Sequence, residues 1–392
     1  MTTRSTRLAA VTVPAVVALL LAGCSGQSSA TGTAQAGATE PIAVRAGDTA
    51  CEVATTSLAA GRHTFEVENT ASQVTEVYVY ATGDRIVGEV ENVGPATRRS
   101  LIVDLTAGDY QVACKPGMVG NGIRTPLSVT GGAAPSQTTD QNLRAAVDSY
   151  RSYVRSETRA LVDTTAAFAT AIGTGNVDQA RQAYPTARLH YERIEPIAES
   201  FGDLDPLIDM RADDATDGTP FVGFHALEQL LFERNTVVGA QQLAADLTAN
   251  VGKLDTLVAT VEFTPLMMGN GAKSLLDEVA KSKVTGEEER YSRIDLVDFA
   301  GNVDGAKYVY TALRPAVLAK DPQLVTTLDQ RFSVLVELLG THMGKAGAPG
   351  FVPGSPYVSY DALTPDDVKA LAVEVDAISE PLGRLSGVVT GG

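Results

Sequence analysis

Histidine and cysteine are scarce in this sequence, whose 392 residues include four His and three Cys. No His-Glu-x-x-His segment occurs, so the usual zinc-peptidase centre of two histidine ligands and a glutamate base is absent. Basic residues are also in deficit, because 31 Lys and Arg against 47 Asp and Glu leave a net charge of −16. This balance argues against nucleic acid as a partner and against adsorption to anionic lipid by electrostatics alone.

The N-terminal apolar run, from Leu8 to Leu21, is too short and wrongly flanked for a permanent membrane span. Arg4 and Arg7 precede it, and this order is typical of a secretion signal. The run ends in Leu21-Ala22-Gly23-Cys24, which resembles the lipobox of bacterial lipoproteins. The resemblance implies a signal peptide over residues 1–23, a lipid on Cys24 and an extracytoplasmic protein anchored to the cell membrane. Ordinary secretion with a coincidental cysteine is the alternative.

Changes in residue pattern divide the rest of the chain. Residues 24–40, rich in Ser, Gly, Ala and Thr, indicate a flexible tether. Residues 41–130 alternate between apolar and polar side chains in short runs, which predicts an all-β sandwich. Residues 131–139 indicate a linker, and residues 140–392 have helical spacing. Strands are expected at residues 64–68, 76–80, 86–90, 100–105, 110–114 and 127–130.

The helical spacing after the linker predicts an all-α bundle. Helices are expected at residues 141–172, 177–201, 240–260, 271–282, 295–318, 322–343 and 365–386.

The β-region, with a cysteine before a Lys-Pro-Gly-Met turn, resembles a cupredoxin. Cys114 and Met118 match part of a blue-copper loop, but such a site needs two histidines beside the cysteine. The one histidine in this region is His63, which we expect at the surface. A standard electron-transfer copper site is therefore excluded. Two alternatives are left for Cys51, Glu76 and Cys114. Either the two cysteines form a structural disulfide, or all three residues form a metal or redox site.

The segment Gly223–Glu228 carries the strongest chemical signal. His225 and Glu228 are three residues apart with helical spacing, so their side chains leave the same face. An imidazole nitrogen beside a carboxylate oxygen suits a transition metal such as iron or zinc. The pair alone is a weak signal, because surface helices carry such pairs by chance.

An acidic row lies upstream of this segment. Arg188, Glu192, Glu195 and Glu199 follow one another at helical spacing, and such a row is usually a solvated face. Here an acidic loop follows directly, and the His225 segment comes next. These acids are therefore able to supply oxygen ligands that one His and one Glu cannot.

Several segments of the C-terminal region resemble the imelysin-like family, once described as peptidases. They are residues 191–196, 201–206, 223–228 and 285–291, and Asp298 with residues 302–306. Behind a cupredoxin-like domain, this region resembles the EfeO-like components of bacterial iron-uptake systems. The resemblance implies a cargo of Fe³⁺ or Fe²⁺, an iron permease and a haem-containing peroxidase as partners.

The family resemblance also implies particular metal ligands. Its His-x-x-Glu motif carries over to His225 and Glu228 as the principal metal site. Glu192, Glu195 and Asp209 are the candidates for completing that site. A second metal or redox centre, with copper or zinc, is implied at Cys51, Glu76 and Cys114.

Three functions compete on this basis. The first is an iron carrier that hands its ion to a permease, and the second is an imelysin-like metallopeptidase. The third is an oxidase role, in which the β-domain changes the oxidation state of iron before transfer. An adhesin-like surface protein is the fallback.

Overall fold

The computed structural model describes residues 40–131, 139–213, 215, 218–281 and 283–390. The predicted signal peptide, the lipidation site Cys24 and all but the last residue of the tether lie outside the described residues, as does most of the linker. Within the described ranges, no helix has the length and apolar character to cross a membrane.

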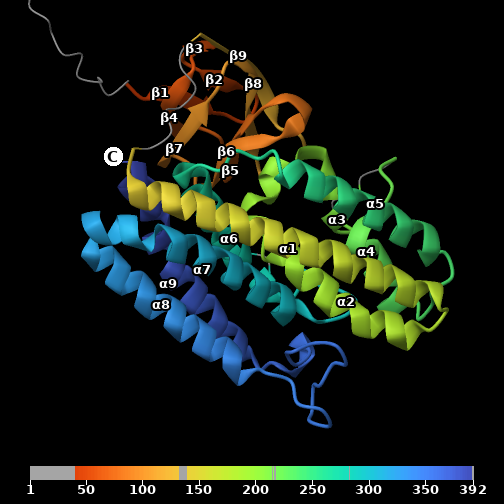
Figure 1. Ribbon diagram of the computed structural model, residues 1–392. Coiled ribbons are helices and arrows are strands. Elements are labelled where there is room, and N and C mark those ends of the chain that lie inside the picture. Colours follow the sequence, from red (N-terminus) through yellow and green to blue (C-terminus); the bar gives the residue numbers. More distant parts are fainter. Residues whose placement is uncertain (1–39, 132–138, 214, 216–217, 282, 391–392) are drawn as a thin grey trace, which may run out of the picture. The chain divides into compact units, whose positions relative to one another are not determined.

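The N-terminal region consists of two β-sheets (Figure 1). One has the order β2-β1-β4-β7 and the other β3-β9-β8-β5-β6; β1 pairs with β4, and β3 with β9, in parallel. The all-β prediction is confirmed. The strands are β1 (Ile42–Ala46), β2 (Cys51–Val53), β3 (Ser57–Ala59), β4 (Gly61–Asn69), β5 (Thr75–Tyr80), β6 (Ile86–Val93), β7 (Arg98–Leu105), β8 (Gly108–Pro116) and β9 (Ile123–Thr130).

Alternation of side chains builds the core between these sheets. Along β4, every second residue is buried, including Phe65 and Val67. The same register turns His63 inward, so the prediction that it lies at the surface was wrong. Its Nε2 lies 2.7 Å from the carbonyl oxygen of Ala59. The six expected strands correspond to β4–β9, whereas β1–β3 were missed because they are only three to five residues long.

The C-terminal region is helical, as predicted, with nine α-helices among the residues described (Figure 1). They are α1 (Gln141–Gly173), α2 (Val177–Glu192), α3 (Asp205–Asp209), α4 (Gly223–Glu228), α5 (Ala240–Val258), α6 (Pro265–Lys281), α7 (Asp295–Lys320), α8 (Pro322–Thr341) and α9 (Pro365–Thr390). The long α1 packs against α2, α5 and α7, and the buried apolar side chains of these helices form one core.

The second predicted helix was too long. It was expected to reach Phe201, but α2 ends at Glu192 and a 3₁₀ segment, Glu195–Leu204, follows. Pro196 explains the break, since proline has no N–H and disfavours α-helical geometry in the residue before it.

Two glycines allow neighbouring helices to pack closely around the polar cluster described below. Gly301 of α7 lies against α2, where an added Cβ would stand 2.5 Å from the Cβ of Glu192. Gly223 opens α4 with a φ of +82°, and an added Cβ would stand 2.3 Å from the carbonyl oxygen of Ile208. This contact holds the end of α3, with Asp209, beside the first turn of α4, with His225.

Candidate metal centre

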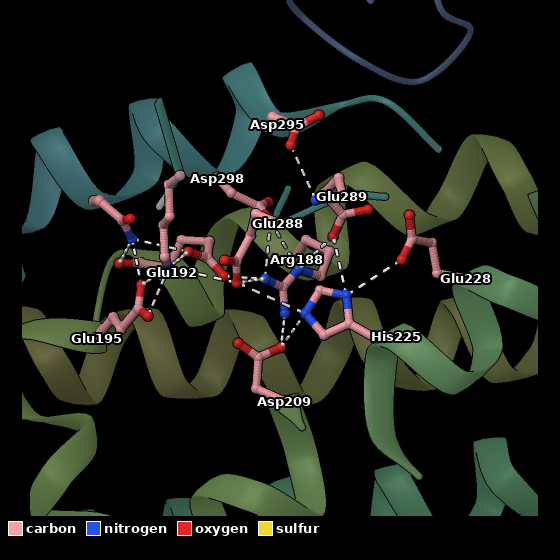
Figure 2. Close-up of polar contacts among 12 residues, drawn as sticks. Arg188, Glu192, Glu195, Asp209, His225, Glu228, Glu288, Glu289, Asp295 and Asp298 are labelled. Atoms are coloured by element: carbon pink, nitrogen blue, oxygen red, sulfur yellow. Dashed lines mark hydrogen bonds and ion pairs between the residues drawn. The ribbon is translucent and has the colours of Figure 1, made fainter. Parts of the chain in front are cut away.

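Charged side chains from five segments meet inside the helical region, where water would normally be excluded (Figure 2). The segments are α2, the start of the 3₁₀ segment Glu195–Leu204, the end of α3, α4, and the stretch from Lys283 into the first turns of α7. Most of these side chains are buried, and such groups are stable only when each charge has a partner. The residues are Arg188, Glu192, Glu195, Asp209, His225, Glu228, Lys283, Glu288, Glu289, Asp295, Asp298 and Asn302.

His225 is held in one orientation by Glu228. Its Nδ1 lies 3.2 Å from Oε2 of Glu228. The other oxygen of Glu228 accepts the backbone N–H groups of Tyr291 and Ser292, at 2.8 and 2.7 Å. A carboxylate can only accept hydrogen bonds, so Nδ1 must carry the proton in this pair. The Glu228 carboxylate is thus fixed on one side by backbone and on the other by the imidazole.

The second imidazole nitrogen, Nε2 of His225, has no hydrogen-bond partner although the residue is only 2 % exposed. It faces Oδ1 of Asp209 at 3.5 Å and Oε1 of Glu288 at 3.7 Å. A buried imidazole nitrogen between two carboxylate oxygens is an arrangement that a cation can bridge.

Two sets of ligand atoms in the described residues have metal-binding spacing, with all atoms of a set within 4.8 Å of one another. One set is Asp209, His225 and Glu288, and the other is His225, Glu228 and Glu289. A small cavity of about 10 Å³ adjoins His225, Glu228 and Glu288. That is room for roughly one water molecule or one ion.

Arg188 lies in the middle of the cluster. The residue is completely buried, and its guanidinium pairs with Glu192 and Asp209. Its Nε lies 3.1 Å from Oε1 of Glu289, and its Nη2 lies 2.9 Å from Oδ2 of Asp298 and 3.9 Å from Oε1 of Glu288. Figure 2 shows it between Glu192 on one side and His225 on the other.

A second buried cation, Lys283, lies at the end of the cluster that Glu192 and Glu195 form. Its Nζ lies 2.7 Å from both oxygens of Glu195, 3.1 Å from Glu192 and 3.7 Å from Glu288. Asn302 also donates to Glu192 and Glu195. This end of the cluster already has a bound ammonium group among its carboxylates.

The buried charged groups near the imidazole shift one another's pKa values. Burial acts to lower the pKa of His225, but the hydrogen bond with Glu228 and the nearby carboxylate of Glu288 outweigh it, and the pKa is raised. Burial acts to raise the pKa of Glu288, but Lys283 and His225 hold it well below its ordinary value. Glu288 is therefore an anion that faces Nε2.

Two other carboxyl groups are shifted in the opposite direction. Burial, with the negative charge of Glu228, raises the pKa of Glu289 well above its ordinary value. Burial raises the pKa of Asp298 to about 7, although Arg188 acts against it. Protons on these groups reduce the negative charge that Arg188 must balance.

The structure brings together three of the five predicted ligands of the main site. They are His225 itself, Glu228 beside its Nδ1, and Asp209 beside its Nε2. Glu192 reaches Arg188 and Lys283, and Glu195 binds Lys283 and Asn302 instead of approaching His225.

Six charged residues of the cluster were not assigned a role from the sequence: Arg188, Lys283, Glu288, Glu289, Asp295 and Asp298. Glu288 and Glu289 lie in segment 285–291, one of the segments that resemble the imelysin-like family. They lie between helices, where no helical or strand periodicity indicates which side chains point into the site. Arg188 was placed in a row of charged side chains of the kind that usually faces solvent. No feature of the sequence indicated a role for Lys283. Helical spacing identifies a shared face but does not show that another helix covers it.

The second predicted site contains a disulfide between Cys51 and Cys114, one of the two alternatives left open by the sequence. The sulfurs are bonded to each other and offer no thiolates. Val77 is paired with Cys114 across β5 and β8, so Glu76, the next residue along, points to the opposite face of the sheet. There it accepts a hydrogen bond of 2.9 Å from the hydroxyl of Tyr78. A centre made by all three residues is therefore not formed in this structure.

Comparison with known proteins gives a consistent result. Residues 146–385 match the imelysin peptidase family, Peptidase_M75. The iron uptake system component EfeO of Yersinia pestis is 36 % identical over 362 residues, which cover 91 % of this chain and 93 % of that protein. The protein of the same name from Escherichia coli K12 is 36 % identical over 355 residues, covering 89 % of this chain and 91 % of its own length.

A solved structure shares the fold. It is described as an iron-regulated protein A precursor from Parabacteroides distasonis, and it aligns with a TM-score of 0.51 and 14 % identity. The alignment covers 65 % of this chain and 96 % of that one. At this identity the likeness concerns the fold alone.

Proposed function

Because this chain belongs to the imelysin family and is a homologue of the EfeO iron-uptake components, we propose that it binds iron in its helical region for delivery to a membrane permease. The cargo ion binds at Nε2 of His225, with Asp209 and Glu288 as oxygen ligands. The observation that carries this assignment is the buried, unpartnered Nε2 between two carboxylates.

The spacing of these atoms supports a first-row transition ion. Ligand atoms about 2.1 Å from one metal lie roughly 3.0–3.4 Å apart. The distances from Nε2, 3.5 Å to Asp209 and 3.7 Å to Glu288, need only a small closure. Hard carboxylate oxygens with one imidazole suit iron in either of its common oxidation states.

Glu228 supports the site through His225. By accepting a hydrogen bond from Nδ1–H, it leaves Nε2 as the nitrogen whose lone pair binds the ion once the imidazole is neutral. Its two backbone hydrogen bonds prevent the carboxylate from turning away. Glu228 is therefore assigned as the residue that orients the ligand His225.

The small cavity argues against the peptidase alternative. A peptidase must place a peptide bond beside its metal and its general base. A cavity of about 10 Å³ accepts an ion or a water molecule, not a polypeptide segment.

The carrier works outside the cytoplasm in this proposal. A lipid on Cys24 would hold it near its permease and near a haem-containing peroxidase partner. The disulfide between Cys51 and Cys114 supports an oxidising compartment, because cytoplasmic thiols are kept reduced.

Calorimetric titration with Fe²⁺ without oxygen, and with Fe³⁺ kept soluble by a weak chelator, tests the proposal. His225→Ala should lower affinity at least ~100-fold, since loss of a residue that merely supports a ligand already costs ~10–100-fold. Asp148→Asn is the control, because the Asp148 side chain is exposed on α1, pairs with Arg151 and should leave the affinity within about threefold of wild type. A wild-type chain without measurable affinity, or one whose affinity survives His225→Ala, would refute the function.

A further inference from the structure

Arg188 uses the same carboxylates that would bind the ion. Its Nη1 pairs with Oδ1 of Asp209, the atom that also lies 3.5 Å from Nε2 of His225. Its Nη2 lies 3.9 Å from Oε1 of Glu288, the atom that lies 3.7 Å from the same nitrogen. A metal ion bound at Nε2 would therefore meet this guanidinium at the same two oxygen atoms.

We infer that Arg188 is a built-in competitor of the cargo ion, which withdraws from Asp209 and Glu288 when the ion binds and returns when it leaves. The inference rests on the proposed function and adds to it a residue that sets the affinity and makes the cargo releasable. Arg188 is not a metal ligand in this scheme, because a guanidinium has no lone pair to donate.

Electrostatics explains why the metal-free protein needs this cation. Buried carboxylates without a counter-charge are strongly destabilising. Arginine keeps its charge under all ordinary conditions, so it balances them whether or not their protons are bound. The ring of Phe224 forms one wall of the Arg188 site, with the guanidinium carbon 5.3 Å from its centroid.

The arrangement gives Arg188 other partners during exchange. Asp209 and Glu288 approach His225, whereas Glu192 and Asp298 also bind the guanidinium from their positions on α2 and α7. Glu289 also lies 3.1 Å from Nε. Arg188 can therefore give up two partners and keep three. An ion of charge two or three replaces a single charge at the shared oxygens, so the exchange favours highly charged cations over monovalent ones.

The test compares Arg188→Gln with the charge-preserving Arg188→Lys in calorimetric titrations with Fe²⁺. Removing the competing charge should tighten binding at least ~10-fold, whereas Arg188→Lys should stay within about threefold of wild type. The metal-free Arg188→Gln chain should also melt at a lower temperature, and its gain in melting temperature on adding Fe²⁺ should exceed that of wild type. Unchanged or weaker binding in Arg188→Gln would overturn the inference, while wild-type binding that depends on His225 would leave the proposed function standing.

A measurement on the wild-type chain covers the case in which Arg188→Gln does not fold. The Nε–H resonance of Arg188, identified by its absence in Arg188→Lys, should shift and exchange faster with water when diamagnetic Zn²⁺ is added. A resonance that stays in place while Zn²⁺ binds would show that Arg188 does not move, and the inference would fail.

Discussion

His225 and Glu228 are joined through Nδ1 and Oε2 at 3.2 Å, so the free nitrogen of the imidazole points toward Asp209 and Glu288. In the proposed site the two residues of the motif have different roles, His225 as a ligand and Glu228 as its support. This division of roles can be tested by substitution.

Glu228→Gln should weaken iron binding by about 10–100-fold, because the amide orients His225 less firmly. Glu288→Gln should weaken it more, since it removes a proposed ligand. Substitution with Co²⁺ distinguishes the roles: its visible spectrum should be nearly unchanged in Glu228→Gln and altered in Glu288→Gln. Similar spectral changes in both variants would make Glu228 a ligand.

Gly223→Ala should disrupt the meeting of α3 and α4. The added Cβ would stand 2.3 Å from the carbonyl oxygen of Ile208, at a φ of +82°. We expect a loss of about 2–3 kcal/mol in unfolding free energy by urea denaturation, with weaker iron binding because Asp209 and His225 separate. Gly252→Ala in α5, where an added Cβ meets nothing within 4 Å, is the control and should be neutral or stabilising.

Removal of the disulfide should destabilise the β-region without affecting iron binding at His225. The bridge spans 63 residues, and a loop of that length predicts a loss of about 4 kcal/mol in the double variant Cys51→Ser and Cys114→Ser. Denaturation with and without a reductant measures the loss. Thiol titration of a Cys24→Ser chain should find no free thiol, and two free thiols would restore the cysteines as candidate ligands.

Stability should depend on pH through Glu157 of α1. Burial acts to raise the pKa of Glu157, but its partners His190, with Nδ1 at 2.7 Å, and Arg193 outweigh it and lower the pKa below its ordinary value. A carboxyl group with a lowered folded-state pKa stabilises the fold above its unfolded-state pKa, and this contribution is lost as the pH falls through the folded-state value.

Glu157→Gln should therefore cost about 1 kcal/mol at pH 7, since solvent partly screens the pair. The difference from wild type should shrink in urea titrations below about pH 4. A difference that stays constant down to pH 3 would contradict the assignment.

Local pattern determined much of this protein. Alternation along residues such as Phe65 and Val67, and helical spacing from Leu143 onward, identified a β-region followed by a helical one. The spacing of His225 and Glu228 was sufficient to place both side chains on one face of a helix. These features depend on residues close in sequence, for which backbone geometry alone fixes the side-chain directions.

Tertiary structure decided which charges meet. Arg188 and Glu192 have the spacing of a solvated row, but α7 covers them, so both are buried members of an ionic network. Glu288 reaches His225 from a loop some sixty residues away in the chain, and Glu195 is diverted to Lys283. Pairing across such separations depends on how helices pack and on the high cost of an unbalanced buried charge, neither of which is encoded in the spacing of neighbouring residues.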